Sequence, residues 1–346
     1  MTGGIRGEAT AVAKKGPELK LADLLRPIAR ELERVERELV EQIGGFDSRV
    51  HGYVDYVVRN SGKRLRPTLA LLSGGATGRI YDGHVTLGVI VELIHIATLV
   101  HDDVLDEAEL RHGSPTANTR WGNEISVLLG DCLFAHALRL AASYPTTEVC
   151  RRISEATNTV CAGEILQTER RFDLNLTVDQ YLDIINMKTA ALFAVSCELG
   201  ASLNGSPPTV VEQLREFGTN LGIAYQIYDD CVDIWGQECQ AGKSLGTDMK
   251  KGKLTLPYLL LLRGCHGEQR RQLGQAIFSQ HPDQRAQLLE SVSRNGVAAE
   301  TRQVVDTYLG RADEALRALS PNLFTATLGA LLRYLTIQTR HLIPAS

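Results

Sequence analysis

Apolar residues recur with the period of an α-helix along almost the whole chain. Strand-like alternation is nearly absent, and Gly or Pro breakers such as Gly44-Gly45 recur about one helix apart. The pattern therefore predicts an all-α fold, a bundle of roughly ten or more helices. The main helical segments are 21–43, 85–110, 125–144, 148–173, 178–203 and 209–235.

No shift in composition divides the chain, which favours a single domain over residues 19–346. Residues 1–18 are rich in Gly, Ala and Lys and lack the apolar core of a secretory signal, so we expect a flexible leader and a cytosolic protein. The longest apolar stretch, 85–100, is interrupted by Glu92 and His95. It falls short of a membrane span, and no transmembrane helix is expected.

Two Asp-Asp-x-x-Asp pentads interrupt this apolar pattern. The first pentad is Asp102, Asp103 and Asp106, and the second is Asp229, Asp230 and Asp233. In a helix the first and last aspartate of each pentad share a face, with Cβ atoms roughly 6 Å apart. Buried carboxylates are too costly to keep ionised alone, whereas divalent cations with oxygen ligands offset their repulsion. Magnesium sites of this kind are usually completed by phosphates, so the pentads point to a diphosphate substrate.

One pentad by itself could equally be a solvated helix face or a local cap, but two in matching apolar contexts argue against that reading. Basic and polar groups accompany them. Each group has a plainer alternative as a basic turn, a local ion pair or an exposed loop. The groups are Lys63 and Arg66 before Pro67, Arg111 with His112, Lys188 with Thr189, Gln226, and a lid-like loop carrying Lys243, Asp248, Lys250, Lys251 and Lys253.

Composition limits the classes of ligand and partner that the protein is expected to bind. The net charge is −4 with 44% hydrophobic residues, and the chain has no Lys/Arg tract of the kind that follows a phosphate backbone, so nucleic acid is not expected. The seven cysteines are scattered without a Cys-x-x-Cys pair, which indicates reduced thiols and neither a disulfide framework nor a structural zinc site.

Several motifs in order, GKRLRP, HDDVLD, the Lys-Thr pair, YQIYDDCVD and GKSLGTD, resemble the trans-isoprenyl diphosphate synthases over about residues 20–340. IHIATLVHDDVLDEAEL is most similar to the long-chain polyprenyl branch. The resemblance implies a helical bundle around a central apolar cavity and a homodimer. It also implies head-to-tail condensation of an allylic diphosphate with isopentenyl diphosphate, in which metals and cations help the allylic C–O bond to ionise.

The resemblance assigns roles to individual residues. About three Mg²⁺ ions would be held by Asp102, Asp106, Asp229 and Asp233. The allylic diphosphate would be held by Arg111, Lys188, Thr189, Gln226 and Lys243, and isopentenyl diphosphate by Lys63, Arg66, His95 and His112. The same catalytic site would include Asp103, Asp230 and Lys253. The family usually has a second arginine where this chain has His112, so the grip on isopentenyl diphosphate is expected to be weaker or pH-dependent.

Product length follows from helix geometry. The growing tail should run from Asp102 back along its helix past Thr98 and Ala97, then Ile94, none of them aromatic. A helical turn of about 5.4 Å matches one isoprene unit, so an open path predicts a product longer than about twenty carbons. Small residues on a helix face also serve as plain packing contacts. The alternatives are a farnesyl or geranylgeranyl synthase, a class I terpene cyclase, and a non-catalytic subunit of a heterodimeric synthase.

Overall fold

The computed structural model describes residues 20–60, 62–111, 113–236, 246–279, 282–294 and 296–344, and these form an all-α fold apart from one small hairpin. The expected leader, residues 1–18, lies outside this part. The helices are α1 (Leu21–Leu24), α2 (Ala29–Glu41), α3 (His51–Arg59), α4 (Leu65–Thr77), α5 (Asp82–Leu105), α6 (Ala117–Trp121), α7 (Asn123–Ala141), α8 (Glu148–Glu169), α9 (Val178–Ile185), α10 (Ala191–Ser202), α11 (Pro208–Trp235), α13 (Thr247–Lys250), α14 (Leu256–Leu262), α15 (Gly267–Phe278), α16 (Pro282–Arg294), α17 (Val297–Arg317) and α18 (Leu323–Leu342).

Shorter elements join the long helices. Three 3-10 turns precede or follow α2 and α3, at Arg26–Ile28, Gln42–Gly45 and Ser48–Val50. A π-helical turn, Asn186–Ala190, connects α9 to α10 without a break. The hairpin consists of β1 (Leu110–Arg111) and β2 (Ser114–Pro115), which pair antiparallel with Leu110 opposite Pro115.

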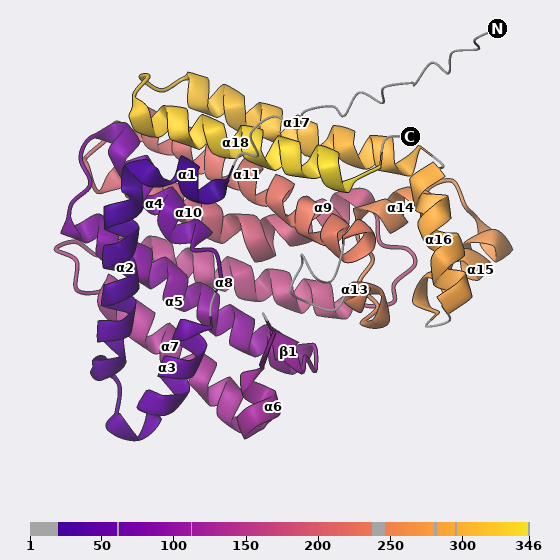
Figure 1. The fold of residues 1–346 in the computed structure, drawn as a ribbon, viewed down its shortest axis with the longest axis horizontal. Coiled ribbons are helices and arrows are strands. Elements are labelled where there is room, and N and C mark those ends of the chain that lie inside the picture. Colours follow the sequence, from indigo (N-terminus) through magenta and orange to yellow (C-terminus); the bar gives the residue numbers. More distant parts are fainter. Residues whose placement is uncertain are drawn as a thin grey trace, which may run out of the picture.

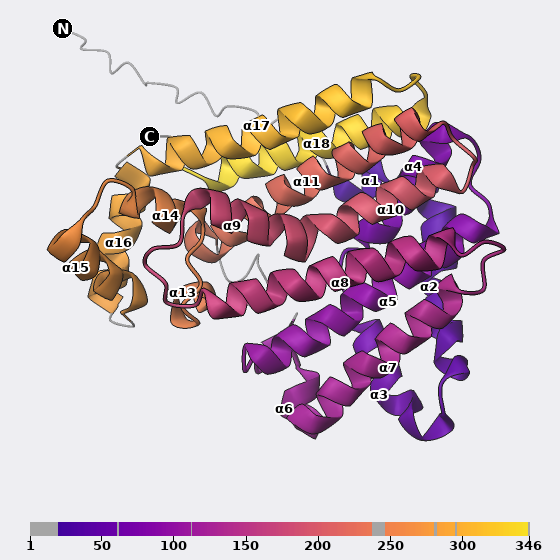
Figure 2. The same ribbon diagram turned by 180° about the vertical axis from the view of Figure 1, so that it is seen from behind.

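The long helices pack in layers around α5 and α11. Figure 1 shows α17 and α18 along one side, α11 and α10 beside them, and α5 and α7 towards the other side, and Figure 2 shows the same order from behind. Helix α11 packs against α10 and α17, while α5 packs against α4 and α7. The bundle therefore buries α5 and α11 on nearly all faces.

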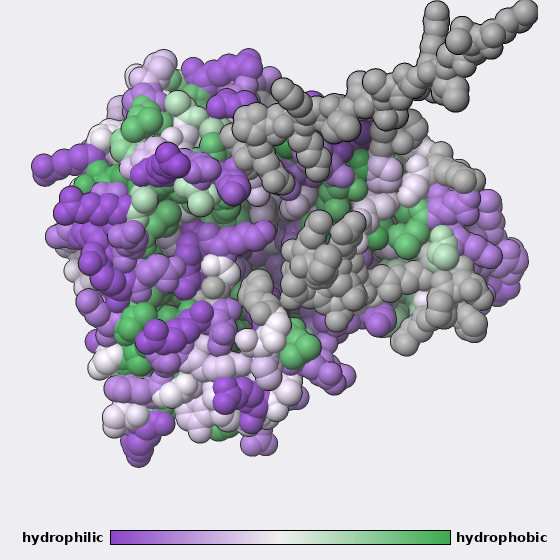
Figure 3. All heavy atoms as spheres, in the orientation of Figure 1, coloured by the Kyte–Doolittle hydropathy of each residue, from purple (hydrophilic) through white to green (hydrophobic). Residues whose placement is uncertain are grey.

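Helix α2 shows how the polar pattern decides which face is buried. Val35 and Leu39 lie one turn apart and are wholly buried, and α2 packs against α5. Its Arg and Glu residues point outward, and hydrophilic side chains gather over α2 on the surface (Figure 3). Burying one such aliphatic side chain contributes about 1.5–3 kcal/mol, which holds α2 against the core.

Two helical stretches are longer and more apolar than expected from the sequence, whose longest apolar stretch was expected to be too short to span a membrane. α5 and the continuous run Val178–Ser202 are both long and apolar enough to cross a bilayer. Most of each apolar stretch is buried inside the fold, 72% of the one in α5 and 78% of the one in Val178–Ser202. Helix α5 continues through Glu92 and His95. Inside a folded protein, neighbouring helices can pair with polar side chains, which lipid chains cannot do.

Candidate active site

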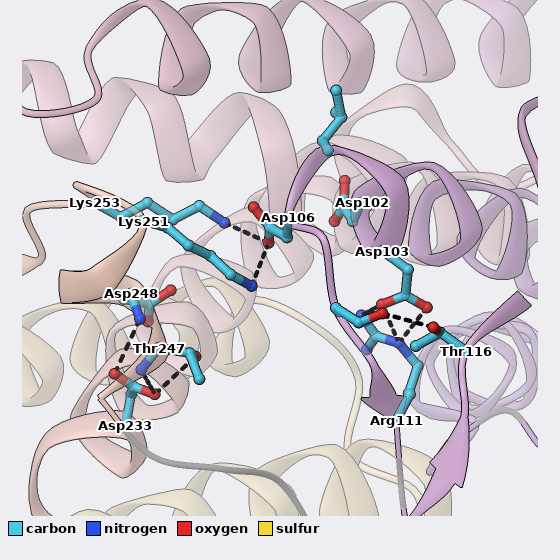
Figure 4. Close-up of polar contacts among 12 residues, drawn as sticks. Asp102, Asp103, Asp106, Arg111, Thr116, Asp233, Thr247, Asp248, Lys251 and Lys253 are labelled. Carbon is cyan, nitrogen blue, oxygen red and sulfur yellow. Dashed lines mark hydrogen bonds and ion pairs between the residues drawn. The ribbon is translucent and has the colours of Figure 1, made fainter. Parts of the chain in front are cut away.

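Both pentads lie at the C-terminal ends of long helices and at the same end of the bundle. α5 ends at Leu105 with Asp106 as its C-cap, and α11 ends at Trp235, two residues beyond Asp233. Figure 4 shows the three aspartates of the first pentad and Asp233 of the second in one view. The last carbonyls of a helix carry partial negative charge, so carboxylates there add to that charge instead of offsetting it. This end of the bundle therefore requires cations.

Three cationic side chains contact Asp106. Lys253 Nζ lies 2.7 Å from Asp106 Oδ2, Arg171 Nη2 lies 2.8 Å from Oδ1, and Lys251 Nζ lies 3.4 Å from Oδ2. Both lysines reach Asp106 from the segment after α13 (Figure 4). Burial alone would raise the pKa of Asp106, but the positive charges of Lys253, Lys251 and Lys188 outweigh it and hold that pKa below its ordinary value. Asp106 is thus ionised and surrounded by positive charge.

Lys188 faces the other end of the first pentad. Its ammonium contacts Glu164 of α8, donates to Gln167 Oε1 at 2.9 Å, and lies 3.5 Å from Asp102 Oδ2. Burial would lower the pKa of Lys188, but Asp102 and Glu164 raise it above its ordinary value, so the side chain stays charged. A buried ammonium shared by two carboxylates can also serve a phosphate oxygen.

The π-helical turn that carries Lys188 is held by close backbone contacts. A Cβ on Gly163 of α8 would lie 2.6 Å from the Lys188 backbone nitrogen, and a Cβ on Gly222 of α11 would lie 2.7 Å from Ala190 Cα. Only glycine permits both approaches. π-helical turns often occur at functional sites, and this one fixes where Lys188 and Thr189 project.

Arg111 forms a local ion pair. From strand β1 it donates to both oxygens of Asp103, with Nη2 2.7 Å from Oδ1 and Nε 3.1 Å from Oδ2. Burial raises the pKa of Asp103 despite this partner. Figure 4 shows Arg111 and Asp103 directed at each other. The arrangement matches the local-pair alternative, and a diphosphate role for Arg111 stays a prediction.

The second pentad is tied into the core by neutral donors. Asp230 accepts from the Tyr181 hydroxyl at 2.6 Å and from Gln226 Nε2 at 2.7 Å, while Gln226 Oε1 accepts from Thr189 Oγ1 at 2.8 Å. Burial, followed by the negative charge of Asp248, raises the pKa of Asp230 well above its ordinary value. Gln226 and Thr189, both expected at the substrate, are thus linked to each other and to the pentad.

Asp233 is directed at α13. Its Oδ1 accepts from the backbone nitrogen and hydroxyl of Thr247, both at 3.2 Å, and its Oδ2 accepts from the Asp248 nitrogen at 3.3 Å. This arrangement caps the start of the short helix (Figure 4). The segment expected to be a mobile, lid-like loop contains a helical turn in its described part, and this turn is fastened to the second pentad.

The expected isopentenyl diphosphate site begins at α4. Lys63 is exposed, and Arg66 lies with its guanidinium carbon 5.0 Å from the centre of the Phe193 ring. Arg66 Nε is buried without a hydrogen-bond partner. Arg64, which precedes the helix with a left-handed backbone, donates to Glu92 Oε1 at 2.8 Å. One cation of the motif thus forms a buried ion pair, and the substrate roles of Lys63 and Arg66 stay predictions.

A family model described as Polyprenyl synthetase matches residues 47–294. The chain belongs to the polyprenyl synthetase family.

Individual relatives cover most of the chain. The octaprenyl diphosphate synthase of Escherichia coli (strain K12) is 34% identical over 84% of this chain and 90% of its own length. The all-trans-nonaprenyl-diphosphate synthase (geranyl-diphosphate specific) of Rhodobacter capsulatus is 34% identical over 90% of this chain and 96% of its own length.

A solved polyprenyl synthase from Caulobacter crescentus CB15, complexed with calcium and isoprenyl diphosphate, superposes with a TM-score of 0.86 at 31% identity. That match covers 93% of this chain and 99% of the solved one. The all-α fold expected from the sequence is confirmed, and the protein is a prenyltransferase that makes polyprenyl diphosphates.

The family binds diphosphate with divalent metal, and the residues of this chain fit that role. The pentads offer only oxygen donors, which hard cations prefer. Among the described residues, no group of three or more His, Cys, Asp or Glu side chains lies close enough to hold a metal ion. The amino groups of Lys251 and Lys253 instead contact Asp106 (Figure 4). The expected cage of two facing carboxylate walls stays a prediction.

The expected chain-length residues lie on α5. Ala97 and Ile94 are buried, and Thr98 is half-buried and donates to the His95 carbonyl at 2.7 Å. His101, one turn beyond Ala97, contacts the Val127 carbonyl of α7 at 3.0 Å. Because Ile94, Ala97 and His101 share a helix face, they lie on the α7 side of α5.

Two residues that were expected to bind the substrates, His112 and Lys243, lie outside the described residues. The structure also adds residues to the site that the motifs did not indicate. Glu92 had a signal, because it interrupts the longest apolar stretch. The other residues do not interrupt the helical pattern, and they lie far from the pentads in the sequence. Only the tertiary structure shows that they contact the site. They are Glu164, Gln167, Arg171 and Tyr181.

Proposed function

We propose that this polyprenyl synthetase extends an allylic diphosphate head-to-tail with isopentenyl diphosphate, to a product longer than about twenty carbons. The observation that carries the proposal is the pair of aspartate pentads at one end of the bundle, with lysines in contact with the first of them. The relatives named above make octaprenyl and nonaprenyl diphosphates, which supports the long-chain product.

The chemistry then depends on charge and position. Magnesium, about three ions on Asp102, Asp106, Asp229 and Asp233, would neutralise the allylic diphosphate when bound. Lys188 and Lys253 add positive charge to the leaving group as the allylic C1–O bond breaks. The Thr189–Gln226 pair offers hydroxyl and amide contacts beside it.

The second substrate is held on the basic side. Lys63, Arg66 and His95 bind the diphosphate of isopentenyl diphosphate, so that its double bond faces the allylic cation. The new C–C bond forms, and the proton lost from the adjacent carbon passes to an oxygen of the released diphosphate. The apolar walls of α5 exclude water, which would otherwise trap the cation as an alcohol.

We also propose a homodimer. Ile125 and Leu128 share a face of α7 with the exposed Cys132, and Leu128 is 59% exposed. On the adjacent helix α8, Ile165 is 60% exposed. Large aliphatic side chains on packed neighbouring helices form a surface that a second copy can bury. A cytosolic location stays a prediction.

The test is elongation itself. Purified protein is incubated with Mg²⁺, farnesyl diphosphate and radiolabelled isopentenyl diphosphate, and dephosphorylated products are separated by chromatography. We expect a ladder ending beyond about twenty carbons. Asp102→Asn should lower the rate about a hundredfold or more, whereas Asp306→Asn on the exposed face of α17 should not change it. A cyclised hydrocarbon, or no product from wild type, would refute the proposal.

A further inference from the structure

Arg171 lies outside every motif that identifies the family, yet its guanidinium reaches the first pentad. It follows α8 and donates to Asp106 Oδ1 at 2.8 Å and to the Leu105 carbonyl at 3.3 Å. Its Nε is buried and has no hydrogen-bond partner. A guanidinium has five N–H donors in a fixed fork, so this one keeps an unused, buried donor on a side chain that contacts the first pentad.

The turn that carries Arg171 is fastened to the turn that carries the two lysines. Phe172 has a left-handed backbone with φ 62°, and its nitrogen donates to the Gly252 carbonyl at 2.8 Å. Gly252, with φ 75°, lies under the Phe172 ring, where a Cβ would come within 2.5 Å of a ring carbon. The Phe172 ring also packs edge-on against Phe278 at 5.1 Å between centroids. Arg171, Lys251 and Lys253 are therefore carried by two turns that form one unit.

Three cations of this unit converge on one carboxylate. Within the described residues, the ion pairs of Arg171, Lys251 and Lys253 all go to Asp106. Each of these side chains has N–H donors beyond the one that contacts Asp106. A diphosphate adjoining Asp106 would offer oxygens to all three.

We propose that Arg171 is a further binding residue for the allylic diphosphate, acting with Lys251 and Lys253 as one cationic unit. With Asp106 engaged by divalent ions, the Arg171 guanidinium would be available to a diphosphate oxygen, which would also give Nε an acceptor. This inference rests on the proposed function, since it deepens the substrate contacts of the same site.

The test measures binding without turnover. Inorganic pyrophosphate is titrated by calorimetry, in the presence of Mg²⁺, into wild type, Arg171→Ala, Arg171→Lys and Arg170→Ala. Arg170 is the matched control, because it pairs with Asp173 at 2.9 Å and its side chain is 45% exposed. We expect Arg171→Ala to weaken binding about tenfold, Arg171→Lys to recover part of the loss, and Arg170→Ala to stay within about twofold.

Steady-state kinetics give a second readout. Arg171→Ala should raise the KM for farnesyl diphosphate more than the KM for isopentenyl diphosphate. If Arg171→Ala binds pyrophosphate as tightly as wild type or more tightly, Arg171 only neutralises Asp106 and the inference is wrong. If Arg171→Ala does not fold, as judged by thermal unfolding, wild-type affinity in Arg171→Lys overturns it equally. Wild type that binds pyrophosphate but makes no polyprenyl product would refute the proposed function alone.

Discussion

At the scale of single residues, Glu92 supports the basic side of the site. It is 1% exposed on α5, its Oε1 accepts from Arg64, and its Oε2 is buried without a hydrogen-bond partner. Burial lowers the pKa of Arg66, and the negative charge of Glu92 acts against that shift. Glu92 thus favours a charged Arg66, and we predict that it acts as a positioning residue for the expected isopentenyl diphosphate site.

Replacing Glu92 tests that dependence. Glu92→Gln keeps the shape but removes the charge, so we expect the KM for isopentenyl diphosphate to rise about tenfold with little change in kcat. The free energy of unfolding in urea should fall by about 1–3 kcal/mol, because Arg64 loses a charged acceptor. Glu36→Gln is the control, since Glu36 binds the same Arg64 with a side chain 49% exposed, and should cost under about 1 kcal/mol. Equal effects of the two changes would contradict this role.

His112 carries a prediction from the sequence alone. Where the family usually has arginine, this chain has an imidazole that is mostly neutral at pH 7 and makes no bidentate contact. His112→Arg should therefore lower the KM for isopentenyl diphosphate. The measurement is initial velocity against isopentenyl diphosphate at saturating allylic substrate, and an unchanged or higher KM would sink the idea.

At the scale of elements, the π-helical turn decides where Lys188 stands. α8 and α11 approach it from two sides through Gly163 and Gly222, and Thr189 is linked through Gln226 to the second pentad. A shift of any of these helices moves the ammonium that serves Asp102. The site therefore depends on close packing of helices as well as on its charged residues.

A single methyl group tests this packing. Gly163→Ala places a Cβ against the Lys188 backbone, which cannot yield as a side chain would, so stability should fall by about 1–3 kcal/mol and kcat/KM about tenfold or more. Gly310→Ala is the matched control in α17, where a Cβ would meet nothing within 4 Å. That change should stabilise the protein by up to about 1 kcal/mol and leave activity unchanged. Normal activity in Gly163→Ala would show that Lys188 tolerates displacement.

At the scale of the whole molecule, helix α5 joins the two parts of the expected site. α5 carries the first pentad at its C-terminal end and Ala97 and Ile94 within the core. Because neighbouring helices enclose α5, we expect a tail that starts at Asp102 to run through the bundle. The long-chain relatives agree with such a path, and the assignment of these residues stays a prediction.

Blocking the path should shorten the product. Ala97→Phe places a ring one turn below Asp102, and we expect the longest product in chromatography to shrink by several isoprene units, since one unit spans about one turn. Ala318→Phe, at the exposed C-cap of α17, should leave the product unchanged. Identical product lengths from Ala97→Phe and wild type would place the tail elsewhere.

Much of the molecule could be predicted from local pattern. The helical period gave the all-α class, and the family and its prenyltransferase activity are confirmed by the comparisons. The Thr189–Gln226 contact also lies where the motifs suggested. Two expectations needed correction. The lid contains helix α13 fastened to Asp233, and α5 is long and apolar enough to span a membrane but is buried in the fold.

The sequence by itself determined which residues carry charge in an apolar setting, because periodicity and motif spacing are local properties of the chain. Only the tertiary structure decided which charges meet. Arg171 on Asp106, Glu164 on Lys188 and Glu92 beside Arg66 join segments that are distant in the sequence. Such pairs depend on how helices cross and on where glycines allow backbones to touch. The pentads and most of the cations near them could be identified in the sequence, whereas their pairing, and the contact of Arg171, depend on packing.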